Sequence, residues 1–372
     1  MARHLALLAL LAALPLQACD DAPVKIGYLA SLSGRGADLG EAGRNGVMLA
    51  VEAHNASGRA PRVDLLIGDD RHDEAEARKA ARELASAGAV AIVGPITSQM
   101  ANALVPVAEE TRTVLISPTV SSYAFVGKDD HFFRINNSTK EYALAYADFH
   151  FGRKGVRRVA LTYDARNAVF SESWASLFRG RFEELGGRVL RTVAFGAAGE
   201  IDFGALVRAL LQKEPDGAAP DAVVIVATSL DAARIAQQVR KENAAIILAA
   251  AEWAAPDQLV QLAGRGADGL LSIESYDRFD ASPRYAAFRQ RYAERFRAEP
   301  NYVSVSAFDA AQVILAALAG RKDASQPLKE AILALRVFEG LQQRIEFDAF
   351  GDTRRRMAHV VVTQGAIRAS GD

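Results

Sequence analysis

Residues 63–98 read "VDLLIGDDRHDEAEARKAARELASAGAVAIVGPITS", and this stretch decides the fold class. It opens on an apolar run, Val63–Ile67, and closes on a second one, Val90–Val93. Between the two runs, the spacing predicts a helix over Asp73–Ala87 with charged residues on one face. Its opposite face carries the small and apolar residues Ala77, Ala80, Ala81 and Leu84. A strand, a helix and a strand at this spacing predict parallel neighbouring strands covered by a helix.

The same alternation continues along most of the chain. Further apolar runs with β-branched residues occur at Val24–Ala30, Val114–Ile116, Val156–Tyr163, Arg188–Phe195, Ala222–Ala227, Ala245–Ala250 and Gly269–Ile273. These are many strands for one open sheet, so we expect an α/β fold of two lobes, each a mainly parallel sheet flanked by helices. Ser117–Asn137 connects the first set to a new helix near Thr139. Two C-terminal strands, at Gln343–Phe347 and Met357–Thr363, fall outside the alternation.

Composition and motifs give no support for several classes of function. The chain has 372 residues and a formal net charge of −1, whereas nucleic-acid binding needs a basic face. Its six histidines are scattered without metal-ligand spacing, so we expect no metal site. The sequence has no Walker A lysine and no Gly-x-Ser-x-Gly nucleophile elbow. We therefore expect a protein that binds a ligand without catalysis and without a cofactor.

The N-terminus has the pattern of an export signal. A short positive start is followed by the apolar run Leu5–Leu14, which is too short to span a bilayer but suits a signal peptide. Cys19, the only cysteine, ends a segment that resembles a bacterial lipobox, which implies cleavage after residue 18 and acylation of Cys19. Asp20 and Asp21 resemble a signal for retention at the cytoplasmic membrane. We expect a lipid-anchored protein on its periplasmic face.

A glycine-rich turn, "SLSGRGADLG" at residues 31–40, offers a competing interpretation. Gly34, Gly36 and Gly40 after a strand suggest a dinucleotide phosphate loop, and Asp69 and Asp70 follow the next strand. However, the glycine spacing is one residue longer than the fingerprint, and Asp69 comes 35 residues after Gly34 instead of about 20. An exported protein also lacks a supply of NAD. We therefore favour a tight turn, and an oxidoreductase is the weaker alternative.

Hydroxyl-bearing loops follow two neighbouring strands. "GPITSQ" at 94–99 places Thr97 or Ser98 at the start of a helix, and "SPTVSS" at 117–122 places Thr119 and Ser121 on the same sheet edge. Helix N-terminal N–H groups with hydroxyls form a site for a carboxylate. The alternative for each loop is an ordinary cap or turn.

The second half of the chain offers an acid and aromatic rings. Glu252 ends an apolar strand and is followed by Trp253, and Phe170 lies in a similar strand-to-helix setting. A carboxylate at such a position faces solvent or awaits a cation, because its burial without a partner is costly. The aromatic rings belong to the core or lie against a ligand ammonium.

The order and spacing of these motifs resemble the branched-chain amino-acid-binding proteins, the type I periplasmic solute-binding components of ABC transporters. The resemblance runs through "VKIGYLASLSGRGADLGEAGRNGVMLAVEAHNASG", "VGPITS", "VLISPTVSS" and "VALTYDARNAVFSESWASLFRGRFEELGG". It implies two lobes that close on a ligand, one formed by residues 24–138 and 277–340, the other by 139–276 and 341–368. It also implies an ABC permease as partner. The alternative is a sensor domain of this fold for an amide or aromatic acid, uncoupled from transport.

The resemblance also assigns roles to particular residues. Ser98, Thr119 and Ser121 match positions that hold a ligand carboxylate, and Glu252 matches the acid that pairs with the ammonium. Phe170 matches a position where an aromatic ring packs against the ligand, and Trp253 follows Glu252. Leu39 and Thr228 stand at ligand-binding positions where the branched-chain binders carry tyrosines. The implied ligand is therefore an amino acid or an analogue, with a side-chain pocket unlike that of the branched-chain binders.

Overall fold

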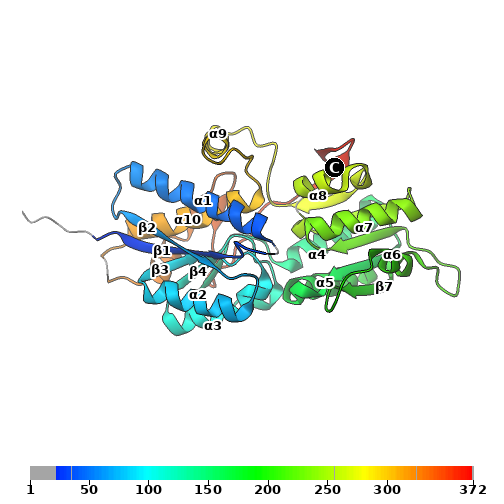
Figure 1. Ribbon diagram of the computed structural model, residues 1–372, viewed down its shortest axis with the longest axis horizontal. Helices are drawn as coiled ribbons and strands as arrows, with labels where there is room; N and C mark the ends of the chain where they lie inside the picture. Colours follow the sequence, from blue (N-terminus) through cyan, green and yellow to red (C-terminus); the bar gives the residue numbers. More distant parts are fainter. Residues whose placement is uncertain (1–21, 35, 255, 324, 371–372) are drawn as a thin grey trace, which may run out of the picture.

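A computed structural model describes residues 22–34, 36–254, 256–323 and 325–370. The predicted signal peptide, 1–18, and the predicted acylation site, Cys19, lie outside these residues. The chain forms two α/β lobes that lie side by side along the long axis of the molecule (Figure 1). The two-lobed type of architecture predicted from the alternation is confirmed.

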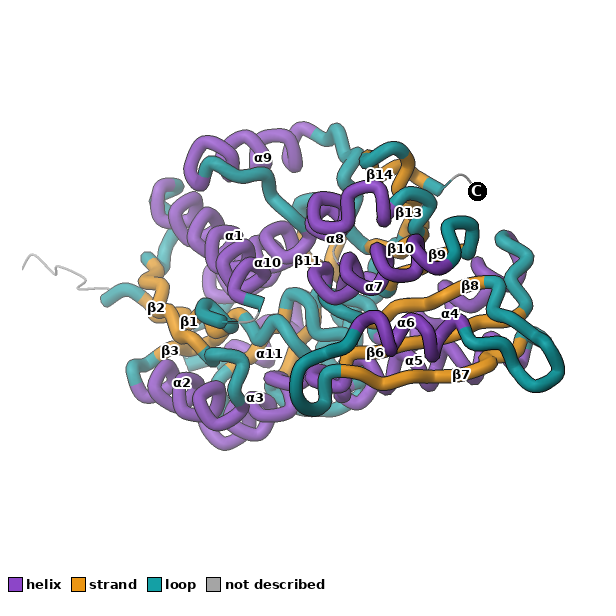
Figure 2. Tube along the Cα trace, turned by 45° about the vertical axis from the view of Figure 1, so that its right-hand side comes forward, coloured by secondary structure: helices purple, strands orange, loops and turns teal. Residues whose placement is uncertain are grey.

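The first lobe contains a parallel five-stranded sheet in the order β2-β1-β3-β4-β5. Its strands are β1 (Val24–Ala30), β2 (Val63–Asp69), β3 (Ala89–Val93), β4 (Val114–Ser117) and β5 (Phe132–Arg134). Helices α1 (Ala37–Ala56), α10 (Tyr302–Gly320) and α11 (Leu328–Leu335) cover one face. The other face is covered by α2 (Glu74–Ser86) and α3 (Ser98–Thr111). On the outer side of α1 and α10 lies α9 (Pro283–Phe296), as Figures 1 and 2 show.

The second lobe contains a seven-stranded sheet in the order β14-β13-β10-β9-β8-β6-β7. Its strands are β6 (Arg158–Asp164), β7 (Arg188–Phe195), β8 (Ala222–Val226), β9 (Ile247–Ala250), β10 (Leu271–Glu274), β13 (Ala358–Thr363) and β14 (Ala366–Ala369). Only β13 and β14 run antiparallel to their neighbours. Helices α4 (Thr139–Asp148) and α5 (Ala168–Glu184) cover one face, and α6 (Phe203–Leu211), α7 (Ser229–Glu242) and α8 (Pro256–Ala263) cover the other.

Short helical turns join several of these elements: η1 (Tyr123–Phe125), η2 (Phe149–Arg153), η3 (Ala165–Asn167), η4 (Glu252–Ala254) and η5 (Gly264–Ala267).

Strand β5 falls inside the stretch expected to be only a connection. The strand has only three residues, which is too short a pattern to recognise from the sequence. Its last residue, Arg134, is charged yet buried. Its guanidinium pairs with Asp352 and donates to the Ser122 carbonyl at 3.0 Å. The partner that makes this burial possible lies more than 200 residues away in the sequence.

A small hairpin, β11 (Val337–Glu339) with β12 (Arg344–Glu346), packs against the first lobe. Ile345 and Phe347 are fully buried in the core beneath the five-stranded sheet, and the Phe347 ring meets Phe133 edge-on at 5.3 Å. The predicted division at residue 341 kept β11 in the first lobe but assigned β12 to the second, whereas both strands pack together against the first lobe. In the structure, the chain joins the second sheet only at β13.

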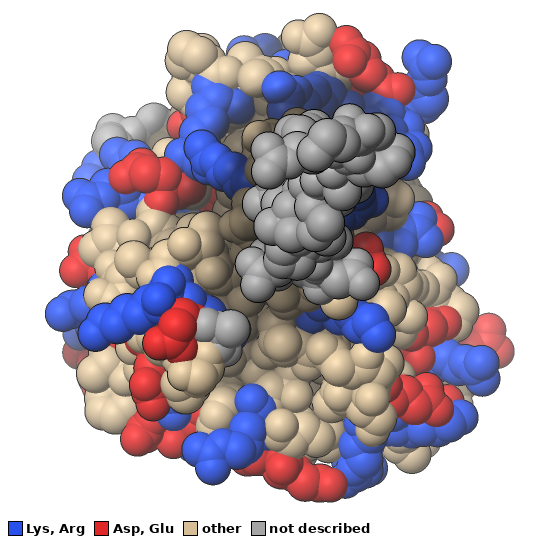
Figure 3. All heavy atoms as spheres, turned by 90° about the vertical axis from the view of Figure 1, so that its left-hand side faces the viewer, with Lys and Arg blue, Asp and Glu red and all other residues tan. Residues whose placement is uncertain are grey.

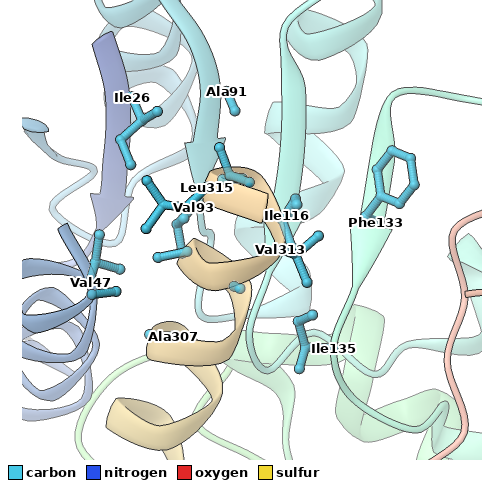
Figure 4. Packing of buried hydrophobic residues seen from close by; sticks show 14 of the residues in the cluster. Ile26, Val47, Ala91, Val93, Ile116, Phe133, Ile135, Ala307, Val313 and Leu315 are labelled. Carbon is cyan, nitrogen blue, oxygen red and sulfur yellow. The ribbon is translucent and has the colours of Figure 1, made fainter. Parts of the chain in front are cut away.

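The core of the first lobe depends on close contact between α1 and α10. Helix α10 is apolar enough along its 19 residues to cross a membrane, but it is mostly buried here, with α1 beside it. Figure 4 shows Leu315 and Val313 of α10 next to Val93 and Ile116 of the sheet. At the crossing, a Cβ on Gly46 of α1 would lie 2.2 Å from the Ser304 carbonyl oxygen, so only glycine fits.

The turn after β1 is a backbone feature, not a nucleotide loop. Gly36 has a positive φ of 80°, and a Cβ on Gly40 would lie 1.9 Å from the Ser31 carbonyl oxygen. Asp69 accepts hydrogen bonds from the Leu32 N–H at 2.9 Å and the Ser33 hydroxyl at 2.6 Å. Both carboxylate oxygens of Asp69 therefore close this turn, where a dinucleotide site would need an acid free for the ribose.

We predict that Gly46→Ala lowers the free energy of unfolding by about 1–3 kcal/mol, because the added methyl forces α1 away from α10. The matched control is Gly180→Ala in α5, where a Cβ meets open space; it should raise stability by about 0.5–1 kcal/mol through helix propensity. Urea unfolding followed by circular dichroism measures both changes. Equal stabilisation by the two substitutions would contradict the close α1–α10 contact.

Candidate ligand-binding site

A small cavity of about 30 Å³ lies between the lobes, where strands of both sheets end. At about 30 Å³ it is close to the volume of one water molecule and far below the 300–1,000 Å³ typical of ligand pockets, so an amino acid would need the lobes to part further. Its lining includes six of the eight residues predicted to bind a ligand: Ser98, Thr119, Ser121, Phe170, Glu252 and Trp253. Five further residues complete it: Ile96, Thr97, Asn136, Asn167 and Tyr302.

One wall of the cavity is the N-terminus of α3, which follows β3. Thr97 caps the helix by accepting a hydrogen bond from the Met100 N–H at 3.4 Å. Ser98 is the first helical residue, and its hydroxyl oxygen accepts a hydrogen bond from the Ser122 N–H at 3.3 Å. The Ser98 hydroxyl proton is therefore directed elsewhere and can be donated. A helix N-terminus with such a donor favours a carboxylate.

The loop after β4 forms the adjoining wall. The Thr119 hydroxyl donates to the Ile96 carbonyl at 2.6 Å, so it ties this loop to the one before α3 and keeps only an acceptor for a ligand. Ser117 supports the same junction by donating to the Pro95 carbonyl at 2.6 Å. The buried Ser121 side chain lines the cavity beside Ser98 and supplies a second hydroxyl. Donors to a carboxylate thus come from Ser98 and Ser121.

The opposite side of the cavity holds Glu252, which follows β9 in the second lobe. The Trp174 indole N–H donates to its Oε2 at 3.1 Å. Its Oε1 is shielded from solvent and has no hydrogen-bond partner within the described part of the chain. Burial raises the pKa of the Glu252 carboxyl to about 8. None of the residues that line the cavity is a lysine, arginine or histidine, so the cavity itself supplies no cation to this acid.

An apolar wall stands next to Glu252. The rings of Phe170 and Trp253 meet edge-on at a centroid distance of 5.5 Å. Tyr302, the first residue of α10, brings a third ring from the first lobe. The sequence pattern did not single out Tyr302, because it lies 50 residues beyond Glu252 and opens a helix that reads as a core helix.

Asn167 joins the two lobes across the cavity, and the sequence analysis missed it. Its Oδ1 accepts a hydrogen bond from the Gln99 N–H of α3 at 3.0 Å, and so satisfies one of the free donors of the helix. Nearby, the Ser122 hydroxyl of the first lobe donates to the Val169 carbonyl of the second at 2.6 Å. These contacts describe a closed arrangement of the lobes. A signal existed, since Asn167 follows a predicted strand end as Ser98 does.

Asn136 was also missed, and it lies in the first connection between the lobes. Its Nδ2 donates to the Thr119 carbonyl at 3.0 Å, and its Oδ1 accepts from the Tyr142 hydroxyl at 2.7 Å. It therefore couples the loop that carries Thr119 to α4 of the second lobe.

The other two predicted residues, Leu39 and Thr228, are not among those that line the cavity. Leu39 is buried in the first-lobe core. Thr228 caps α7 by accepting a hydrogen bond from the Asp231 N–H. For metals, the described residues contain no group of three or more His, Cys, Asp or Glu side chains that could hold an ion.

The raised pKa of Glu252 predicts a pH dependence of stability in the ligand-free protein. Between about pH 4.5 and 8 the folded chain holds this proton more tightly than the unfolded chain, so stability falls as pH rises through this window and levels off above it. The slope is at most about 1.4 kcal/mol per pH unit. Glu252→Gln removes the titration, so the stability of wild type relative to Glu252→Gln should decrease from pH 5 to pH 8 in urea unfolding. A constant difference would contradict the raised pKa.

Comparisons with known proteins agree with this geometry. The family described as periplasmic binding protein matches residues 23–368. A Leu/Ile/Val-binding protein homologue from Brucella melitensis is 22% identical over 84% of this chain and 83% of its own length.

Solved structures show the same fold. A leucine-binding protein from Thermotoga maritima is 26% identical, with a TM-score of 0.82 over 94% of this chain and 98% of that one. A solute-binding protein from R. palustris in complex with benzoate is 20% identical, with a TM-score of 0.82 over 94% of this chain and 96% of that one. Since the family match spans nearly all of the described residues, this chain belongs to the periplasmic binding protein family.

Proposed function

We propose that this chain captures a small α-amino acid, or an analogue with a free amine, between its lobes and delivers it to an ABC permease. Family membership implies an extracytoplasmic location and a solute-binding role. The observation that carries the choice of ligand is the Glu252 carboxyl, whose Oε1 is buried without a hydrogen-bond partner among the described residues. Acylation at Cys19 would tether the protein to the membrane beside its permease.

Two opposite groups of a zwitterion match the two sides of the cavity. A ligand carboxylate at the α3 N-terminus would accept from the hydroxyls of Ser98 and Ser121 and from free helix N–H groups. A ligand ammonium would donate to Glu252, the only charged residue that lines the cavity in the described part of the chain. Each charge-assisted hydrogen bond contributes about 1.5–3 kcal/mol, so two or three of them with some apolar burial reach micromolar affinity, about −8 kcal/mol.

The same acid argues against a ligand that is only an anion. The R. palustris protein holds benzoate, which has a carboxylate and no amine. In this chain, a benzoate at the α3 N-terminus would leave Glu252 without a cation and would add a second carboxyl group to a cavity lined by no basic side chain. An ammonium can ionise the Glu252 carboxyl and pair with it, which an aromatic acid cannot do, so an amine-bearing ligand is favoured over an aromatic acid.

The proposal predicts that Glu252→Ala weakens binding of α-amino acids by about 3 kcal/mol or more, a factor of at least 100, because the ammonium is left buried and unpaired. Isothermal titration calorimetry with a panel from glycine to leucine, and with benzoate, identifies the ligand and measures the change. Glu172→Ala is the matched control, since Glu172 is exposed on α5. Equal affinity of wild type and Glu252→Ala for the amino acid bound most tightly, or tight binding of benzoate alone, would contradict the proposal.

A further inference from the structure

A second hollow, of about 680 Å³, lies on the outer side of the first lobe, beneath α9. It is bounded by the C-terminal half of α1, by α9, by α10 and by Leu341. It shares no lining residue with the cavity between the lobes. Both views of the chain show α9 on the outer side of α1 and α10 (Figures 1 and 2).

The floor of this hollow is apolar. Its accessible apolar surface comes from Phe308 and from alanines of α1 and α9, over the buried Leu49, Phe288 and Leu341. The Phe288 ring meets Phe308 edge-on at 5.0 Å. Small side chains on the two facing helices leave the space open: Ala53, Ala56 and Ala287. The volume is within the range of sites that hold small organic molecules.

The rim of the hollow is charged, with three arginines against two glutamates: Arg284, Arg291, Arg295, Glu52 and Glu294. Arg295 and Glu52 pair at 3.4 Å, and Arg284 donates to the Glu339 carbonyl at 2.7 Å. Arg291 makes no ion pair within the described residues, and the three arginines and two glutamates give the rim a net charge of +1, which favours an anion. Figure 3 shows blue side chains gathered in the upper part of this end of the molecule, the level at which α9 lies in Figure 1.

We propose that the hollow beneath α9 is a second binding site, for an amphiphilic monoanion with one apolar chain, a fatty-acid carboxylate. Its chain lies on the apolar floor, and its carboxylate accepts from the Arg291 guanidinium at the rim. The site goes beyond the proposed function, because it needs neither the cavity between the lobes nor Glu252.

The packing of α9 favours this occupant over a membrane surface. A helix that lies on a bilayer presents its apolar face to the lipid. On α9 that face is turned into the protein, since Tyr285, Phe288 and Tyr292 are each at most 4% exposed. The arginines can bind an anion, but α9 has no outward apolar face to insert into a bilayer. We therefore favour one free amphiphile that enters the hollow over a membrane surface.

Titration of the purified protein with decanoate, below its micelle concentration, tests the site by calorimetry. We expect one decanoate per chain, weaker binding of hexanoate and of uncharged decanol, and a three- to tenfold loss of affinity in Arg291→Gln. Arg289→Gln is the matched control on the same helix, because Arg289 pairs with Glu299 at 2.7 Å and does not line the hollow.

A second pair of variants separates binding in the hollow from binding elsewhere. Ala287→Trp fills the hollow and should abolish decanoate binding. Ala286 is the preceding residue, is exposed and does not line the hollow, so Ala286→Trp should leave decanoate binding intact. Amino-acid binding between the lobes should be unchanged in both, which shows that they fold. No decanoate binding, binding unchanged by Ala287→Trp, displacement of decanoate by the amino acid, or binding only to anionic phospholipid vesicles would each overturn the proposal.

Discussion

The Glu252 carboxyl has one oxygen bound to the Trp174 indole and the other shielded from water without a partner. An unsatisfied polar atom of this kind costs about 1–3 kcal/mol, and more if the group is charged. The described structure offers no lysine, arginine or histidine in the cavity to relieve that cost. With its pKa raised to about 8 by burial, the carboxyl is protonated at neutral pH in the ligand-free protein. Under the proposed function, a ligand ammonium would relieve this cost, and the stability lost at Glu252 would be recovered as binding affinity.

The rest of the fold places a helix N-terminus and hydroxyl groups opposite this acid, where the proposed function puts the carboxylate of the ligand. Parallel strands of two separate sheets end at the same cleft, so loops distant in sequence face each other there. The first lobe supplies helix N–H groups and hydroxyls, and the second supplies the acid and the Phe170–Trp253 wall. The hydrogen bond from Gln99 to Asn167 crosses between them. A ligand enters only if this bond and the Ser122–Val169 bond open, so binding and lobe movement are linked.

The alternation of apolar runs was sufficient to predict the fold, because each strand of a covered parallel sheet is apolar along its length. Strands β1 and β7 have the predicted bounds, whereas β5 was missed because Arg134 is buried only through its tertiary contact with Asp352. Position at a strand end, together with family resemblance, located Ser98, Thr119, Ser121, Phe170, Glu252 and Trp253 at one cavity. Tyr302 could not be ranked from sequence, since it reaches the cavity only through the packing of α10, whereas Asn167 carried the strand-end signal and was missed. Leu39 lies at a strand-to-helix turn like the residues that line the cavity, but its side chain is buried in the core of the first lobe.

The number of protons released on binding tests the central claim most directly, because it reports on the charge of Glu252. Calorimetry of the tightest-binding amino acid at pH 7, in buffers of different ionisation enthalpy, gives this number. If a neutral Glu252 loses its proton to meet the ligand ammonium, close to one proton should be released per ligand bound, and none in Glu252→Gln. Binding of the amino acid by the wild-type protein without proton release would contradict the account.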